Sequence, residues 1–320
     1  MNRFRLKSVS FRHHWLLDGV SFELKNCLLI LGPALSGKTM LACALGDVSA
    51  SLCGSRSDAY YELDVCVDVF REGEGLSERK WTIIPGKHMA EWPSIGEICE
   101  TQAIDWLKGW RAVDPSSDSA HDDRMWTLRH IVKPGGWDKE RFEYVHGYAR
   151  AFFRYVQCDD RGFQRWWEAD DWWDAPDSYK HWLSLLTYLA DPGNTLLVLD
   201  NAFGRMDVRL CDLVFEAIVS AAAGFEKRVI MLTHDPYWAY CWLKRFSPPS
   251  TGPLPFPRSS RRGGNQKKGK AEGGTKVPML FMVRDYDADR VRMISVHRDI
   301  VLNPKKLFED WLMDMPYWSC

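Results

Sequence analysis

The sequence predicts an α/β fold in which helices flank a mostly parallel sheet, with antiparallel strands near the N-terminus and a helical insertion. Two observations favour this class. Short, continuously apolar runs at 27–31, 195–200 and 228–233 are typical of strands buried on both faces, and helical segments separate them. The first run leads into a glycine-bounded loop at 32–39, and a helix is expected to begin directly after it.

Five segments are expected along the chain. Residues 1–93 form the first part of a core domain that contains the loop, and residues 94–177 form a Trp-rich helical insertion with an apolar helix face between 140 and 156. Residues 178–246 complete the core. Residues 247–276 are rich in proline, glycine and basic residues and predict a flexible loop, and residues 277–320 predict a hairpin followed by a helix.

Composition excludes several classes of protein. The 320 residues carry a net charge of −1, which excludes a wholly basic nucleic-acid-binding protein but allows a local basic patch. The nine cysteines contain no CxxC pair, so neither a zinc site nor a disulfide framework is expected. No apolar run is long enough to span a bilayer, and a cytoplasmic location is therefore expected.

Tryptophan is concentrated in one part of the chain. Of the 16 tryptophans, 11 fall between positions 81 and 182. Large aromatic side chains usually belong to a core or an interface, so a subdomain packed with indole rings is the simpler interpretation. A surface on which nucleic-acid bases stack is the alternative.

The loop at 32–39 matches the phosphate-binding pattern GxxxxGK[ST]. In this pattern the backbone amides form a concave anion site, the lysine reaches the β- and γ-phosphates, and the final hydroxyl binds Mg²⁺. A fortuitous turn is the alternative, but the position between an apolar strand and a helix favours nucleotide binding. The residues expected to surround the phosphates are Gly32, Pro33, Ser36, Gly37, Lys38 and Thr39.

Two further buried strands end in polar residues. Asp200 ends the run at 195–200, and at the carboxyl edge of a parallel sheet it would reach the Mg²⁺ ion beside the loop. His234 follows the run at 228–233, where it would contact the γ-phosphate or the attacking water. Each residue alone would be read as structural, and the loop at 32–39 favours a catalytic role for both.

Together these segments resemble the ATP-binding-cassette (ABC) ATPase superfamily over about residues 3–245. The resemblance implies ATP and Mg²⁺ as ligands and a homodimer or heterodimer formed through the ATP sites. It implies that Asp200 is the Walker B aspartate, Asp207 the D-loop aspartate and His234 the switch histidine. An aromatic residue before the loop stacks on adenine in this family, and Phe11 is the best match, with Trp15 as a substitute.

The sequence departs from the family pattern at three places. Ser178 lies at the spacing of the LSGGQ signature serine, but both glycines are missing; Ser178 would cap the helix that follows and offer that helix to a partner's γ-phosphate. A plain N-cap serine is the alternative. Asn201 replaces the catalytic glutamate, and a carboxamide cannot accept a proton, so slow hydrolysis is expected. Gly86 stands where the Q-loop glutamine is expected.

The helix before Asp200 looks like that of ATPase heads in chromosome maintenance, recombination and phage defence. We therefore expect an ATP-gated clamp or switch that acts in a nucleic-acid-related or antiviral-defence complex, together with a protein partner or effector. DNA or RNA would contact basic residues of the loop at 258–276, chiefly Arg261, Arg262, Lys267 and Lys268. The alternatives are the motor of a membrane transporter, a regulatory scaffold that binds ATP without turnover and, more remotely, a P-loop kinase.

Overall fold

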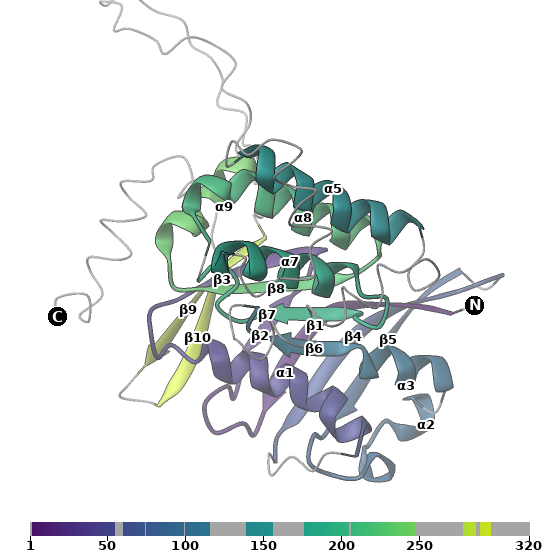
Figure 1. The fold of residues 1–320 in the computed structure, drawn as a ribbon. Helices are drawn as coiled ribbons and strands as arrows, with labels where there is room; N and C mark the ends of the chain where they lie inside the picture. Colours follow the sequence, from purple (N-terminus) through teal and green to yellow (C-terminus); the bar gives the residue numbers. More distant parts are fainter. Residues whose placement is uncertain are drawn as a thin grey trace, which may run out of the picture.

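The computed structural model describes residues 2–54, 60–73, 75–98, 100–115, 139–155, 176–204, 206–246, 278–285 and 289–295 (Figure 1). The strands of these residues are β1 (Arg3–Arg12), β2 (Ser21–Glu23), β3 (Cys27–Leu31), β4 (Glu62–Arg71), β5 (Gly75–Ile83), β6 (Trp110–Val113), β7 (Leu196–Leu199), β8 (Arg228–Thr233), β9 (Met279–Asp285) and β10 (Arg290–Ser295). The helices are α1 (Lys38–Leu52), α2 (Ile95–Ile98), α3 (Thr101–Lys108), α5 (Lys139–Tyr155), α7 (Asp177–Ala190), α8 (Cys211–Gly224) and α9 (Pro236–Phe246), with 3-10 turns η1 (Met89–Glu91) and η3 (Val208–Leu210).

The central sheet has the strand order β10-β9-β3-β8-β7-β6. Strand β3 runs parallel to both of its neighbours, β8 and β9, and the pairs β7–β8 and β6–β7 are also parallel. Only the β9–β10 hairpin at one edge is antiparallel. The predicted α/β class with a mostly parallel sheet is confirmed, and so is the predicted hairpin.

A second sheet, with the order β2-β1-β4-β5, is antiparallel throughout. Strands β1 and β4 pair along their whole length, with a register shift between Leu6 and Ser8. The alternating burial of β4 shows that one face of this sheet packs on a core while the other is more exposed. The predicted N-terminal antiparallel strands are thus confirmed.

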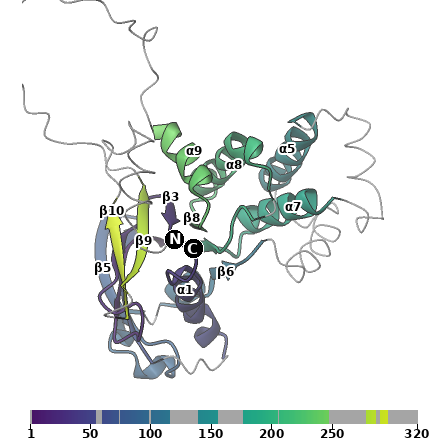
Figure 2. The same cartoon turned by 90° about the vertical axis from the view of Figure 1, so that its left-hand side faces the viewer.

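Helix α1 lies on one side of the central sheet and helices α5, α7, α8 and α9 lie on the other (Figure 2). A hydrophobic core fills each side. In β3, Leu28 and Ile30 face a core shared with α1 and the antiparallel sheet, whereas Leu29 and Leu31 face a core shared with α5, α7, α8 and α9. Because successive strand residues point to opposite faces, a strand covered on both sides must be apolar at every position. All five residues of β3 are indeed buried.

The expectation of a helical insertion at 94–177 is wrong at one point, because β6 is a strand at the edge of the central sheet. Trp110 at its start is fully buried, and the preceding Gly109 accepts hydrogen bonds from the amides of Thr195 and Leu196 (2.8 and 3.4 Å). A side chain at Gly109 would lie 2.6 Å from the Gly193 carbonyl oxygen, so this close approach requires glycine. Pairing with β7 therefore holds these four residues in the extended conformation of a strand.

Helix α5 confirms the predicted apolar face, with Val145, Ala149, Phe152 and Phe153 buried. Four tryptophans of the Trp-rich part are 2% exposed or less, which supports the core interpretation for Trp81, Trp92, Trp110 and Trp182. The predicted loop at 247–276 and C-terminal helix lie outside the described residues. Within the described residues, none of the helices has both the length and the apolar character needed to cross a membrane.

Candidate functional site

The glycine-bounded loop lies between β3 and α1, at the carboxyl edge of the central sheet. Gly37 is the N-cap of α1 with φ 97°, a left-handed conformation that glycine adopts without strain. No side chain caps α1, so the free amides of its first turn remain available to an anion. The amide of Gly32 donates to the Thr233 carbonyl (3.1 Å), which ties the loop to the end of β8.

The β9–β10 hairpin packs directly behind this loop. A Cβ atom on Gly32 would lie 2.6 Å from the Met282 carbonyl oxygen, and one on Gly37 would lie 3.1 Å from Val291 Cγ2. The amide of Val291 also donates to the Leu16 carbonyl (3.2 Å). Sequence reasoning missed this contact, because nothing local in residues 279–295 indicates which strand they join.

Lys38 folds back into the loop. Its Nζ donates to the carbonyls of Gly32 (2.8 Å) and Pro33 (2.7 Å) and to the hydroxyl of Ser36 (3.3 Å). Burial lowers the pKa of Lys38 to about 8, and the negative charge of Asp200 partly opposes this change. The ammonium is thus partly buried at a place where an anion would stabilise its charge, while Thr39 is exposed beside it.

Asp200 directly follows β7, and its amide donates to the Val113 carbonyl of β6 (2.8 Å). Its carboxylate is half-buried and acts electrostatically on Lys38 and on Cys43, which lie on the first two turns of α1. The structure therefore brings Asp200 to the loop, as the sequence predicts.

Asn201 has a left-handed backbone with φ 51°. Asparagine tolerates this conformation better than most residues that carry a Cβ. Its carboxamide lies against the turn at Gly204, where an added Cβ would overlap Asn201 Nδ2, and the amide of Gly204 donates to the Asn201 carbonyl (3.1 Å). The backbone at this position thus favours asparagine over a longer acidic side chain.

His234 is exposed and directly follows β8, next to the residue whose carbonyl holds Gly32. The turn after it is fixed by Asp235, whose amide donates to Thr233 Oγ1 (3.1 Å) and whose Oδ1 accepts from the Tyr237 amide (2.8 Å). His234 therefore lies at the carboxyl edge beside the loop.

Asp207 lies on the exposed turn before η3. The Arg209 side chain donates to both of its carboxylate oxygens (3.0 and 2.9 Å from Nε), and this pair lowers the pKa of Asp207 to about 2. The carboxylate is therefore ionised and already paired on its own turn.

The structure does not support Phe11 as the residue that stacks on adenine, and it leaves Trp15 exposed. Phe11 is fully buried in the core, in edge contact with His14, so neither ring face is open to a base. Trp15 is 62% exposed and stacks on His14 at 6.2 Å between ring centroids. His14 is itself fixed, because its Nδ1 accepts from the amides of Leu16 and Leu17 (3.1 Å each).

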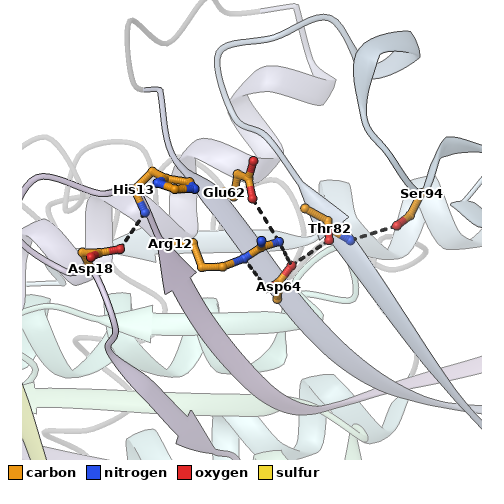
Figure 3. A network of polar contacts seen from close by, with 7 residues as sticks. All are labelled: Arg12, His13, Asp18, Glu62, Asp64, Thr82 and Ser94. Atoms are coloured by element: carbon orange, nitrogen blue, oxygen red, sulfur yellow. Dashed lines mark hydrogen bonds and ion pairs between the residues drawn. The ribbon is translucent and has the colours of Figure 1, made fainter.

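The turn that carries Trp15 is attached to a polar network at the end of β1 (Figure 3). The amide of His13 donates to Asp18 Oδ1 (2.7 Å), which closes the turn. The neighbouring Arg12 pairs with Asp64 (2.6 Å) and Glu62 (2.9 Å) on β4. Two further bonds extend the network to β5 and the start of α2: Thr82 Oγ1 donates to Asp64 (2.6 Å), and the Thr82 amide donates to Ser94 Oγ (3.1 Å).

Ser178 is not the N-cap that the sequence suggested. Helix α7 begins at Asp177 with Pro176 as its N-cap, and Ser178 is its second residue and half-buried. Pro176 has an extended backbone (φ −56°, ψ 141°) and Asp177 is already helical, so the helix begins before Ser178 can cap it. Gly86 has φ 89°, and its amide donates to Ser51 Oγ (3.2 Å), so the turn itself disfavours glutamine there.

The four basic residues proposed for nucleic acid, Arg261, Arg262, Lys267 and Lys268, lie outside the described residues. The residues that the structure does bring together are the loop at 32–39, Asp200, Asn201 and His234, all at the carboxyl edge of β3, β7 and β8. Phosphate-binding crevices of open parallel sheets occupy this edge.

Comparison with known proteins places this arrangement in a known fold. The chain is similar to the crystal structure of an Smc head bound to the C-winged helix domain of ScpA, with a TM-score of 0.50 and 11% identity over 93% of this chain and 99% of that one. The chain shares the fold of that Smc head. No family model matches the sequence, and no curated protein matches it.

Two other solved structures are similar to the chain at lower TM-scores. The SMC head domain from Thermotoga maritima gives a TM-score of 0.45 and 9% identity over 91% of this chain and 99% of that one. The protein cbiO1 from Clostridium perfringens, part of the ABC transporter complex cbiONQ, gives a TM-score of 0.44 and 11% identity over 98% of this chain and 95% of that one.

Proposed function

We propose that this ATPase head binds ATP with Mg²⁺, hydrolyses it slowly, and works as an ATP-gated clamp or switch. The observation that carries the proposal is the desolvated ammonium of Lys38, held over an uncapped helix N-terminus at the carboxyl edge of the sheet. A cation and several aligned amides around one small space suit a polyphosphate.

The oxygen atoms beside this space suit Mg²⁺, which prefers carboxylate, hydroxyl and phosphate ligands. Thr39 and Asp200 would hold the ion, and Trp15 would stack on adenine from the turn that follows β1. His234 would contact the γ-phosphate or the water beside it. When bound, the metal neutralises charge on the phosphates, while the residues of the chain position the nucleotide and its water.

Slow hydrolysis is inferred from Asn201. A carboxamide can orient a water molecule but cannot take its proton, and loss of a general base typically slows chemistry by about 10²–10⁴-fold. The left-handed backbone at this position supports the same conclusion, because it favours asparagine as the resident side chain. The nucleotide would then act mainly as a ligand that holds one state of the protein.

ATP-dependent dimerisation is the further part of this proposal. Asp207 and the start of α7 at Ser178 would face the partner's nucleotide, by the resemblance to ABC ATPases. One structural neighbour is an Smc head bound to a domain of ScpA, which supports a protein partner here. A role in a nucleic-acid-related or antiviral-defence complex would require the basic residues at 261–268 to bind DNA or RNA in a salt-dependent way.

The decisive experiment measures ATP binding by calorimetry and turnover by phosphate release, with wild type beside Lys38→Ala and Asn201→Asp. We expect wild type to bind ATP tightly and turn it over slowly, Lys38→Ala to lose binding, and Asn201→Asp to gain turnover. Absence of ATP binding by folded wild-type protein would refute the proposal. Fast wild-type turnover that Asn201→Asp leaves unchanged would refute the slow-hydrolysis part.

Two measurements distinguish the clamp from the alternatives. Size-exclusion chromatography with and without ATP and Mg²⁺ should show a dimer that requires the nucleotide, and an unchanged monomer would argue against the clamp. Complete absence of turnover in Asn201→Asp as well as wild type would favour a non-hydrolysing scaffold. Nucleic-acid binding that is lost when Arg261, Arg262, Lys267 and Lys268 are neutralised would favour the nucleic-acid role over a transporter motor.

A further inference from the structure

A basic cavity of about 700 Å³ lies between β1, the end of β4, the end of α8 and the start of β8. It is at the opposite end of the central strands from the nucleotide site. Asn26 directly precedes β3 and Arg228 begins β8, whereas the phosphate loop follows the last residue of β3. Five strand residues span roughly 16 Å, so the cavity is separate from the phosphate loop.

Arg228 is the buried charge of this cavity, with a residue exposure of 7%. Its Nε donates to the Leu6 carbonyl (3.1 Å) and its Nη1 donates to Asn26 Oδ1. Within the described part of the chain it forms no ion pair with a carboxylate. Burial, together with the charge of Arg5, lowers the pKa of Arg228 to about 10, while Cys27 and Asp68 act in the opposite direction. A buried guanidinium without a counter-ion is costly.

Arg5 is the second charge without an ion pair. It lies opposite Asp68 in the β1–β4 register, yet it forms no ion pair with this or any other carboxylate of the described residues. Its Nη2 donates to Asn26 Oδ1 (2.9 Å), the same atom that accepts from Arg228. Two guanidinium groups therefore converge on one neutral oxygen, an arrangement that favours a nearby anion.

The other arginines of the cavity have carboxylate partners. Arg3 pairs with Glu226 (2.8 Å), and Arg71 pairs with Glu100 (2.6 Å). Glu72 also lines the cavity, and Arg5 and Arg228 are the two lining arginines that form no ion pair within the described residues; they lie on either side of Asn26. This restricts the expected ligand position to one end of the cavity.

We propose that this cavity binds a phosphate group, clamped between the guanidinium groups of Arg5 and Arg228. Planar guanidinium groups donate paired hydrogen bonds that match the oxygens of a phosphate. The volume lies in the range of small-ligand sites and leaves room for an ester attached to the phosphate. The shared chemistry is the phosphate group, which would come either from inorganic phosphate or from a small phosphomonoester.

The test uses the full chain with Lys38→Ala, so that the phosphate loop does not contribute. Calorimetry at constant ionic strength would titrate inorganic phosphate and, separately, ribose 5-phosphate. We expect Arg5→Ala to lower the association constant at least tenfold. The matched control is Lys7→Ala, which removes an exposed positive charge from the same strand outside the cavity, and it should change the constant less than twofold.

A second variant addresses the buried charge. Arg228→Met should abolish the rise in melting temperature that phosphate gives the parent, while thermal unfolding without phosphate checks that the variant is folded. Equal binding of both probes would support inorganic phosphate as the ligand, and tighter binding of ribose 5-phosphate would support an ester. Absence of binding to either probe, or equal losses in Arg5→Ala and Lys7→Ala, would overturn the proposal.

Discussion

Replacing Gly32 by alanine tests how closely the phosphate loop depends on the β9–β10 hairpin. The new Cβ would lie 2.6 Å from the Met282 carbonyl oxygen and 2.6 Å from Ser36 Oγ, where real Cβ contacts are almost never below 3.0 Å. The serine can rotate away, but the Met282 oxygen belongs to a strand backbone. Strand β9 must therefore move from the loop by about 0.4 Å or more.

Overpacking of this kind costs about 1–3 kcal/mol of unfolding free energy. In a protein of 320 residues the melting temperature should then fall by roughly 1.5–4.5 °C. ATP affinity should fall at least tenfold, because the displaced loop no longer holds its amides and Lys38 in one geometry.

Calorimetric unfolding and ATP titration would measure both effects. Gly147→Ala is the control, because this exposed glycine of α5 has no atom within 4 Å of an added Cβ. Alanine there should stabilise the helix by up to about 1 kcal/mol and leave ATP binding unchanged. An unchanged melting temperature and ATP affinity in Gly32→Ala would refute the proposed support of the loop by the hairpin.

Three further changes test the other parts of the site. Asn201→Asp and Asn201→Glu should both raise turnover. Glutamate in this left-handed backbone should lower the unfolding free energy by about 1 kcal/mol more than aspartate does. Equal melting temperatures of the two variants would contradict the backbone argument. Because the pKa of free Lys38 is lowered to about 8, ATP binding should raise this pKa, and the protein should take up roughly half a proton at pH 8. ATP affinity should therefore fall above pH 8. Titrations in buffers of different ionisation enthalpy would measure the proton uptake, and a binding heat that does not depend on the buffer would contradict it. Trp15→Ala should weaken ATP binding by about 1–3 kcal/mol without loss of stability, whereas Phe11→Ala should lower the unfolding free energy by about 3–5 kcal/mol. Binding and unfolding measurements check both effects. Loss of ATP affinity in Phe11→Ala but not in Trp15→Ala would restore Phe11 as the stacking residue.

The parts that sequence predicted correctly are those with a local signal. Strand β3 is apolar at every position because both of its faces are covered, and this pattern is visible without any structure. The loop between Gly32 and Thr39 carries its own signature, since glycines, lysine and hydroxyl must occur at fixed spacing. Asp200 could be predicted as a site residue because it directly follows β7, a second strand that is apolar at every position.

The parts that sequence missed depend on distant partners. Strand β6 is four residues long, too short for a period to be recognised, and its conformation is set by β7. The burial of Phe11 could have been predicted from the alternation along β1. Val9 and Phe11 are two residues apart, so their side chains lie on the same face of the strand, and that face packs on the core. The contact of the hairpin with the loop had no such signal, because register between distant strands is not encoded locally.

Because the loop at 32–39 packs against the β9–β10 hairpin, the site can be completed only after the hairpin has been synthesised. Gly37 and Val291 are in contact but separated by roughly 250 residues, which take about 12–50 s to translate at ordinary rates. Throughout that interval the nascent chain carries Lys38 and Thr39 without the backing that Met282 and Val291 provide. Competence for ATP would thus be acquired only once residues 279–295 have been synthesised and β9 has paired with β3.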